Sequence, residues 1–235
     1  MTPLPLQPAA IARLIDHTLL RADAVPAEIE KLCREALHYS FASVCVNSVY
    51  VPLVARELRG SSLALCSVAG FPLGAMLAEA KRREAELALA AGAREIDMVL
   101  HVGALKAGED AAVAADIRGI AGACRSAGAL CKVILETALL TDEEKRRACL
   151  LARDAGAAFV KTSTGFGPGG ATPSDVRLIR ETVGPAMGVK ASGGVRSFDD
   201  LLQMVEAGAT RIGTSAGVKI VEEARARFAA AGSPR

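Results

Sequence analysis

The sequence predicts a single α/β domain built as a (β/α)8 barrel, a TIM barrel, and three observations lead to this fold class. Short apolar runs recur along the chain with amphipathic segments between them, which is typical of parallel strands joined by crossover helices. Eight such units in 235 residues average about 29 residues each, close to the ~250 residues of a barrel. Polar residues lie at the ends of several runs, and in a barrel these ends meet at one mouth.

The alternative is an open, doubly wound sheet. No expected strand is followed by G-x-G-x-x-G, and the polar residues are spread over many strand ends rather than gathered at one switch point. We expect one domain over residues 1–235, with a short N-terminal extension at 1–10 and a frayed tail at 230–235. No linker, low-complexity segment or close repeat indicates a second domain.

The first four units are apolar strands followed by helices with one buried face. Acidic residues in the first turn of the first helix, after Pro26, favour its dipole. Gly92 and Gly128 end the third and fourth helices. We expect strands at 14–20, 43–47, 63–68 and 95–100, and helices at 26–38, 49–58, 79–92 and 111–127.

The last four units follow the same plan and carry clearer helix starts. Thr141-Asp-Glu-Glu is a capping box, and Ser197-Phe-Asp-Asp caps a later helix. The strand that ends at Lys161 is followed by a glycine-rich loop, as expected where a chain wraps around a ligand. We expect strands at 130–135, 158–161, 189–191 and 211–213, and helices at 141–156, 172–183, 197–207 and 217–229.

Composition favours a small-molecule partner. The 28 Lys and Arg residues nearly balance 26 Asp and Glu residues, which argues against a nucleic-acid footprint or a polybasic membrane anchor. Aromatic residues make up 3% of the chain with no Trp, so a stacking platform for single-stranded nucleic acid is not expected. No segment reaches the ~20 apolar residues of a membrane span, and the N-terminus does not resemble a secretion signal.

The six cysteines and three histidines show no metal-binding spacing. Without C-x-x-C or another zinc pattern, we expect the cysteines to be reduced core thiols of a cytoplasmic protein. The histidines lie far apart in the sequence, so a metal site is not expected, and we expect no other cofactor.

Two lysines and one aspartate are the main candidates for chemistry. Lys161 ends an apolar strand, where it either extends to solvent or is paired or reactive. Lys190 lies within the next apolar strand, and two lysines that face one another favour a nucleophilic amine. By strand parity Asp97 points into the barrel, where it either forms a plain salt bridge or handles protons.

Other strands carry polar residues that could bind substrate. Asp16 and Thr18 alternate in the first strand, and we interpret them as ligands of substrate hydroxyls or as capping and supporting residues. Cys45 is a further candidate, although small core residues are often cysteine. Lys132 and Glu136 share a parity and could form an internal ion pair.

Glycine turns after the last strands predict a phosphate site. Backbone amides and a helix N-terminus at this end of a barrel favour an anion, which makes a phosphorylated substrate the expected partner. Thr164 is expected to touch substrate from the loop after Lys161. The candidate phosphate ligands are Gly193, Gly194, Gly213, Thr214 and Ser215.

Segments spread from Leu14 to Val218, in consistent order, resemble the deoxyribose-phosphate aldolase family. The Lys-Thr-Ser-Thr-Gly and Lys-Ala-Ser-Gly-Gly pair is the most specific of them, whereas many phosphate-binding barrels share the glycine turns. The segments are Leu-Ile-Asp-His-Thr-Leu-Leu, Ser-Val-Cys-Val-Asn, Glu-Ile-Asp-Met-Val, Lys-Val-Ile-Leu-Glu-Thr, Phe-Val-Lys-Thr-Ser-Thr-Gly-Phe, Val-Lys-Ala-Ser-Gly-Gly-Val-Arg and Arg-Ile-Gly-Thr-Ser.

The resemblance implies a metal-independent, commonly dimeric enzyme that interconverts 2-deoxy-D-ribose 5-phosphate with D-glyceraldehyde 3-phosphate and acetaldehyde. It implies that Lys161 forms the Schiff base, that Lys190 lowers its basicity and that Asp97 relays protons through water. Two departures bear on phosphate affinity and proton transfer but not on the carbon–carbon chemistry. Some members have a lysine where Phe166 stands here, and some end in a tyrosine where this chain ends in Pro-Arg.

Other functions are compatible with parts of this pattern. Transaldolase and class I fructose-bisphosphate aldolase also use a lysine in a barrel. A phosphosugar isomerase would not need a covalent lysine, and a phosphosugar-binding protein would not turn over. Formation of an imine on Lys161 separates the aldolases from the other two classes.

Overall fold

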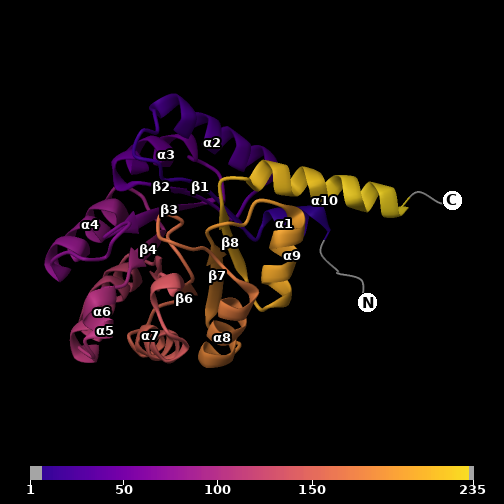
Figure 1. Cartoon of the computed structure of the whole chain (residues 1–235). Helices are drawn as coiled ribbons and strands as arrows, with labels where there is room; N and C mark the ends of the chain where they lie inside the picture. The colour runs from indigo at the N-terminus through magenta and orange to yellow at the C-terminus, as the bar shows by residue number, and fades with distance from the viewer. Residues whose placement is uncertain (1–6, 233–235) are drawn as a thin grey trace.

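The computed structural model describes residues 7–232 and shows a closed eight-stranded barrel surrounded by helices (Figure 1). Each strand pairs in parallel with the next along the chain, and β8 closes the ring against β1. The predicted TIM-barrel fold is confirmed, and the open-sheet alternative is wrong. The strands are β1 Ile15–Leu19, β2 Ser43–Val46, β3 Ala64–Ala69, β4 Glu95–Val99, β5 Leu130–Ile134, β6 Phe159–Lys161, β7 Gly188–Ser192 and β8 Arg211–Thr214.

The α-helices cover the outside of this barrel (Figure 1). None of the helices in the described part of the chain is both long and apolar enough to cross a membrane. The helices are α1 Pro8–Ala12, α2 Pro26–Tyr39, α3 Val51–Glu57, α4 Ala78–Ala90, α5 Val102–Lys106, α6 Asp110–Ser126, α7 Asp142–Asp154, α8 Pro173–Val183, α9 Phe198–Glu206 and α10 Gly217–Gly232, with 3-10 turns η1 Ser48–Tyr50 and η2 Thr137–Leu139.

The ends of the described chain are more helical than expected. Helix α1 begins at Pro8, inside the stretch expected as an extension at 1–10. Helix α10 continues to Gly232, past the expected start of the tail at 230. The rest of the expected extension and tail lies outside the described residues.

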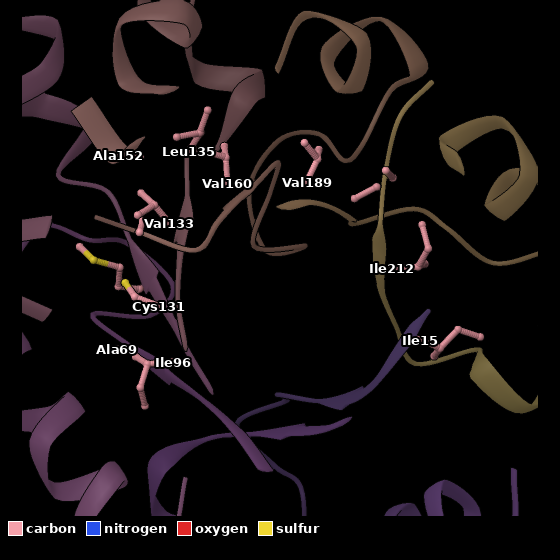
Figure 2. Packing of buried hydrophobic residues seen from close by; sticks show 14 of the residues in the cluster. Ile15, Ala69, Ile96, Cys131, Val133, Leu135, Ala152, Val160, Val189 and Ile212 are labelled. Atoms are coloured by element: carbon pink, nitrogen blue, oxygen red, sulfur yellow. The ribbon is translucent and has the colours of Figure 1, made fainter. Parts of the chain in front are cut away.

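Strand parity separates an apolar outer layer from a polar interior. Figure 2 shows buried side chains such as Ile96, Val160 and Val189 packed around the barrel. Their strand neighbours Asp97, Lys161 and Lys190 belong to the opposite face and are buried inside the barrel. The hydrophobic core therefore lies mainly between sheet and helices, and it leaves the interior free for charged side chains.

Glycines on β7 and β8 make space for large interior side chains. A Cβ at Gly213 would lie 2.9 Å from Cε of Lys190, so any larger residue at this position would displace the lysine side chain. At the lower end of the barrel, a Cβ at Gly188 would lie 2.2 Å from Cδ1 of Phe159. The Phe159 ring in turn packs against the guanidinium of Arg211, whose Cζ is 5.4 Å from the ring centroid.

Candidate active site

Six strands contribute charged side chains to the interior of the barrel. They are buried or nearly so, because the strands bring them together around the barrel axis with the apolar layer outside. These side chains are Asp16 of β1, Glu95 and Asp97 of β4, Lys132 of β5, Lys161 of β6, Lys190 of β7 and Arg211 of β8.

Asp97 lies at the centre of this group and is bonded to three lysines. Its Oδ2 accepts from Nζ of Lys161 at 2.8 Å and from Nζ of Lys190 at 2.7 Å. Its Oδ1 accepts from Nζ of Lys132 at 2.7 Å. Burial alone would raise the pKa of Asp97, but the three lysines hold it well below the usual range. Asp97 is therefore a carboxylate, and its charge is shared among several amines.

Lys190 and Lys161 differ in how firmly they are held. Lys190 is fully buried and donates to Asp16 Oδ2 at 2.5 Å as well as to Asp97. Burial would lower the pKa of Lys190, yet Asp16 and Asp97 raise it, so Lys190 remains an ammonium ion. Lys161 has one carboxylate contact and reaches the cavity at the barrel mouth. Of these two amines, Lys161 is the one that a ligand can reach.

A cavity of about 430 Å³ opens at the carboxyl ends of the strands. Lys161 and the glycine turns after β7 and β8 lie in its wall, and its volume is that of a small-molecule site. Phe166 contributes an exposed aromatic ring that packs edge-on against Phe71. The predicted site residues in the wall are Thr18, Lys161, Thr164, Gly193, Gly194, Gly213, Thr214 and Ser215.

The other predicted site residues lie deeper in the barrel. Asp16, Cys45, Asp97 and Lys190 are fully buried and do not line the cavity. Asp16 is bonded to Lys190, and Cys45 packs with Cys66, so neither side chain meets the cavity directly. The structure thus divides the predicted residues between the cavity wall and a buried layer deeper in the barrel.

All three threonines among the predicted site residues use their hydroxyls within the protein. Thr18 donates to the carbonyl of Asp16 at 2.8 Å, and Thr214 donates to the carbonyl of Val195 at 2.7 Å. Thr164 donates to Glu136 Oε2. These bonds shape the loops around the cavity, and only the remaining lone pairs of each hydroxyl are left for a ligand.

Lys132 and Glu136 do not form the ion pair considered from their parity. The strand ends at Ile134, and Glu136 turns away with φ 58° to accept from Thr164. Lys132 instead contacts Glu95 at 2.6 Å and Asp97 at 2.7 Å. The alternation of side chains between the two faces holds only within a strand, so it does not predict the direction of Glu136, which lies beyond the end of β5.

Sequence reasoning missed the contribution of Arg211. Its Nη1 lies 2.6 Å from Asp16 Oδ1 and 3.1 Å from Glu95 Oε2, which links β8 to both β1 and β4. The available signal was parity, because Arg211 precedes Gly213 by two positions and so shares its face of β8.

The sulfur atoms of Cys45 and Cys66 and a carboxylate oxygen of Asp97 lie within 4.8 Å of one another, and atoms of these types can bind a metal ion. Both Asp97 oxygens are already bonded to lysines, and the Cys66 thiol donates to Asp97 Oδ1 at 3.2 Å. The group is thus part of the charged hydrogen-bond network. Two histidines also have structural partners, since His17 bonds Glu35 at 2.8 Å and His101 accepts from the Ala104 amide at 2.9 Å.

The geometry is suited to covalent chemistry on an amine. A lysine in the wall of a cavity can attack a carbonyl, and a carboxylate 2.8 Å from its Nζ can exchange a proton with it directly. A buried ammonium 2.7 Å from the same carboxylate disfavours a second positive charge.

Comparisons with known proteins place the chain in an aldolase family. The family described as DeoC/LacD family aldolase matches residues 10–223. The deoxyribose-phosphate aldolase of Geobacillus sp. (strain WCH70) is 58% identical over 212 residues, which cover 90% of this chain and 95% of the relative. That of Bacillus subtilis (strain 168) is 57% identical over 213 residues, covering 91% of this chain and 95% of the relative.

Solved structures are similar as well. The tetrameric deoxyribose phosphate aldolase from Aeropyrum pernix matches with a TM-score of 0.88 and 39% sequence identity, covering 94% of this chain and 93% of that chain. A sialic acid aldolase from Ruminococcus gnavus has a TM-score of 0.64 at 12% identity over 94% of this chain and 75% of that chain, a similarity of fold alone.

Proposed function

Because the chain belongs to the DeoC/LacD aldolase family, we propose that it reversibly cleaves 2-deoxy-D-ribose 5-phosphate to D-glyceraldehyde 3-phosphate and acetaldehyde. It is a lyase with deoxyribose-phosphate aldolase activity, the activity named for relatives 57–58% identical to it. The observation that carries the mechanism is Lys161 in the cavity wall, bonded to a buried carboxylate and next to a second, fixed ammonium.

Lys161 is the nucleophile in this proposal. Its neutral amine forms a bond to C1 of the open-chain sugar, and loss of water leaves a protonated imine. Removal of the proton from the C3 hydroxyl then breaks the C2–C3 bond. The bonding electrons move toward the imine nitrogen, C3 becomes the aldehyde carbon of glyceraldehyde 3-phosphate, and an enamine remains on Lys161. Protonation at C2 and hydrolysis of the imine release acetaldehyde and restore the amine.

Asp97 and Lys190 assist this cycle from below the cavity. Asp97 is fully buried, so it exchanges protons with the substrate hydroxyl through a water molecule. Lys190 keeps its charge because Asp16 and Asp97 surround it, and this fixed charge disfavours protonation of Lys161. Asp16 acts through Lys190 in this proposal, which is the supporting role considered from the sequence and not the substrate contact.

The phosphate binds at the glycine turns after β7 and β8 in this proposal. Gly193 and Gly194 lie in the turn after β7, while Ser215 is exposed just before helix α10. Backbone amides of glycine turns and the N-terminus of a 16-residue helix favour an anion there. Arg196 also lines the cavity and adds positive charge.

We further propose that the enzyme needs no metal or other cofactor, since the imine of Lys161 serves as the electron sink. A homo-oligomer is proposed as well, supported by the tetramer of the Aeropyrum pernix relative. The six cysteines are free and buried, which supports a reducing compartment such as the cytoplasm.

Borohydride trapping with acetaldehyde tests the proposal. Reduction of the imine should leave an ethyl group on Lys161, identified by mass mapping of peptides, and Lys161→Arg should lose both the adduct and at least 99% of the turnover, about 2.7 kcal/mol in the barrier. Lys106, which is exposed and pairs with Glu144, provides a matched control as Lys106→Arg. An unmodified Lys161, or full adduct yield in Lys161→Arg, would contradict the proposal.

A further inference from the structure

Three charged residues form a layer beneath Asp97 that the mechanism above does not use. Lys132 lies 2.6 Å from Glu95 Oε2, and Arg211 lies 3.1 Å from the same oxygen. All three belong to the barrel interior, with side chains no more than 15% exposed. We call Glu95, Lys132 and Arg211 the floor network.

The floor network bonds one oxygen of Asp16 and one oxygen of Asp97, and we call these two residues the upper carboxylates. Arg211 bonds Oδ1 of Asp16 at 2.6 Å, while Lys190 bonds Oδ2 of the same residue. Lys132 bonds Oδ1 of Asp97 at 2.7 Å, while Oδ2 accepts from Lys161 and Lys190. Each carboxylate thus has one oxygen bonded to a floor cation and the other bonded to Lys190, and Lys132 also lies 3.6 Å from Oδ2 of Asp16.

The charges in this interior do not balance when every basic group is protonated. The described part of the barrel interior holds the basic groups Lys132, Lys161, Lys190 and Arg211, and the carboxylates Asp16, Glu95 and Asp97. From β2 and β3 the thiols of Cys45 and Cys66 face the same space, with Cys66 donating to Asp97. An uncompensated charge is costly at such a buried site, so one basic group is expected to be neutral.

Lys161 has fewer carboxylate contacts than the other three basic groups. Arg211 is a guanidinium and does not lose its proton. Burial would lower the pKa of Lys132, but Asp97 and its other neighbours hold it well above its usual range. Lys190 lies between Asp16 and Asp97. Lys161 has a single carboxylate partner, which Lys132 and Lys190 share.

We propose that the floor network positions Asp16 and Asp97 and sets the charge balance that leaves the Lys161 amine unprotonated. Glu95, Lys132 and Arg211 are positioning residues in this role, because they act through the two upper carboxylates. The inference rests on the proposed function, since it concerns the same imine-forming lysine.

Two substitutions of opposite charge test the network. Lys132→Met removes a cation, so all the remaining amines can be protonated. The fall of kcat/KM on the acid side of its pH profile, its acid limb, should therefore move to higher pH by about 0.5 unit or more. Glu95→Gln removes an anion with little change in size, and the same limb should move to lower pH. The double variant should return the limb close to that of the unmodified enzyme, because the excess of one basic group is restored.

The controls separate charge from structure. Lys132→Arg and Arg211→Lys keep the charge, so each should keep the acid limb within about 0.2 unit whatever it does to the maximal rate. The pH dependence of imine formation with acetaldehyde should show the same shifts. If Lys132→Met does not fold by circular dichroism, Glu95→Gln and Lys132→Arg decide the matter by themselves.

Shifts of both single variants in one direction, or no shift in Glu95→Gln, would overturn the inference. Such a result leaves the proposed function intact as long as the unmodified enzyme still forms the reducible adduct on Lys161. Absence of that adduct in the unmodified enzyme would instead remove the proposed function.

Discussion

Lys190 shows how a buried side chain can contribute without touching the cavity. It is fully buried, bonded to Asp16 and Asp97, and displaced from the wall in which Lys161 lies. The two lysines are direct neighbours in the pairing of β6 with β7. A fixed positive charge beside the nucleophile favours its neutral form, and the structure supplies the carboxylates that keep Lys190 charged.

Lys190→Leu should therefore impair Lys161 at neutral pH without unfolding the chain. We expect kcat at pH 7 to fall at least about 100-fold and the acid limb of kcat/KM to move to higher pH, because Lys161 then holds its proton more tightly. Borohydride trapping should still give the Lys161 adduct, slowly and best at alkaline pH. Rates and pH dependence equal to those of the unmodified enzyme would reduce Lys190 to a structural partner of Asp97.

Ser215 offers a test of the phosphate side of the cavity. Ser215→Glu places a carboxylate near the N-terminus of α10, where it should repel a phosphate. We expect KM for 2-deoxy-D-ribose 5-phosphate to rise at least about tenfold, or 1.4 kcal/mol, while turnover of unphosphorylated deoxyribose changes little. Ser215→Gln, similar in size but neutral, is the matched control. Equal losses on both substrates in the glutamate variant would place the phosphate elsewhere.

At the residue scale, sequence reasoning could find the side chains but not their partners. Parity within strands correctly placed Asp97, Lys161 and Lys190 in the interior, since it depends only on local backbone geometry. The contacts of Arg211 with Asp16 and Glu95 join strands distant along the chain. They depend on how far each side chain reaches across a closed barrel, which no local pattern encodes.

At the element scale, the sequence predicted long helices well and short ones poorly. The capping box at Thr141 begins α7 as expected, with its side chain accepting from the Glu144 amide at 3.2 Å. Helix α5 was not expected, because its five residues give too short a pattern and its cap is the ring of His101. The strand ends differ from the expected ranges by at most one residue.

Buried ion pairs between helices are a second feature that periodicity could not predict. Lys81 of α4 is fully buried, and its Nζ lies 2.5 Å from Asp116 of α6 and 3.0 Å from the carbonyl of Val99. Lys145 of α7 meets Asp175 of α8 in the same way at 2.6 Å. These lysines lie on helix faces that would otherwise be read as polar and exposed, and here they tie neighbouring helices together.

Lys81→Met should cost about 3–5 kcal/mol in the free energy of unfolding, because it leaves Asp116 charged and without its cation in the protein interior. Urea denaturation followed by circular dichroism measures this change. The double variant Lys81→Met with Asp116→Leu should recover much of the loss, since no unpaired charge then remains. A single variant as stable as the unmodified protein would show that the pair contributes nothing. Arg83→Met, at an exposed pair with Glu86, should change stability by less than about 1 kcal/mol.

At the scale of the whole molecule, the fold followed from the repetition of units. Eight apolar runs with helices between them were enough to predict a closed barrel, because right-handed parallel connections leave few other arrangements. The charged interior is the feature that repetition alone would not suggest. It places ion pairs where barrels usually hold layers of apolar side chains, so the same interior that supports chemistry also makes stability depend on pH.

Asp97 should account for part of the loss in unfolding free energy at acid pH. Its pKa is held well below the usual range in the folded chain, so its contribution to stability is complete above the unfolded value of about 3.9 and is lost as the pH falls through the folded value. Asp97→Asn removes that contribution at every pH. The difference in unfolding free energy between the unmodified protein and Asp97→Asn should therefore be largest near pH 7 and should shrink progressively below about pH 4.

Denaturant titrations of both proteins from pH 7 to pH 3 measure this difference. Because His17 and the surface carboxylates are common to both proteins, their titration cancels. A difference that stays constant over this range would mean that the lysines around Asp97 do not stabilise its charge, and the charge balance inferred for the barrel interior would lose its basis.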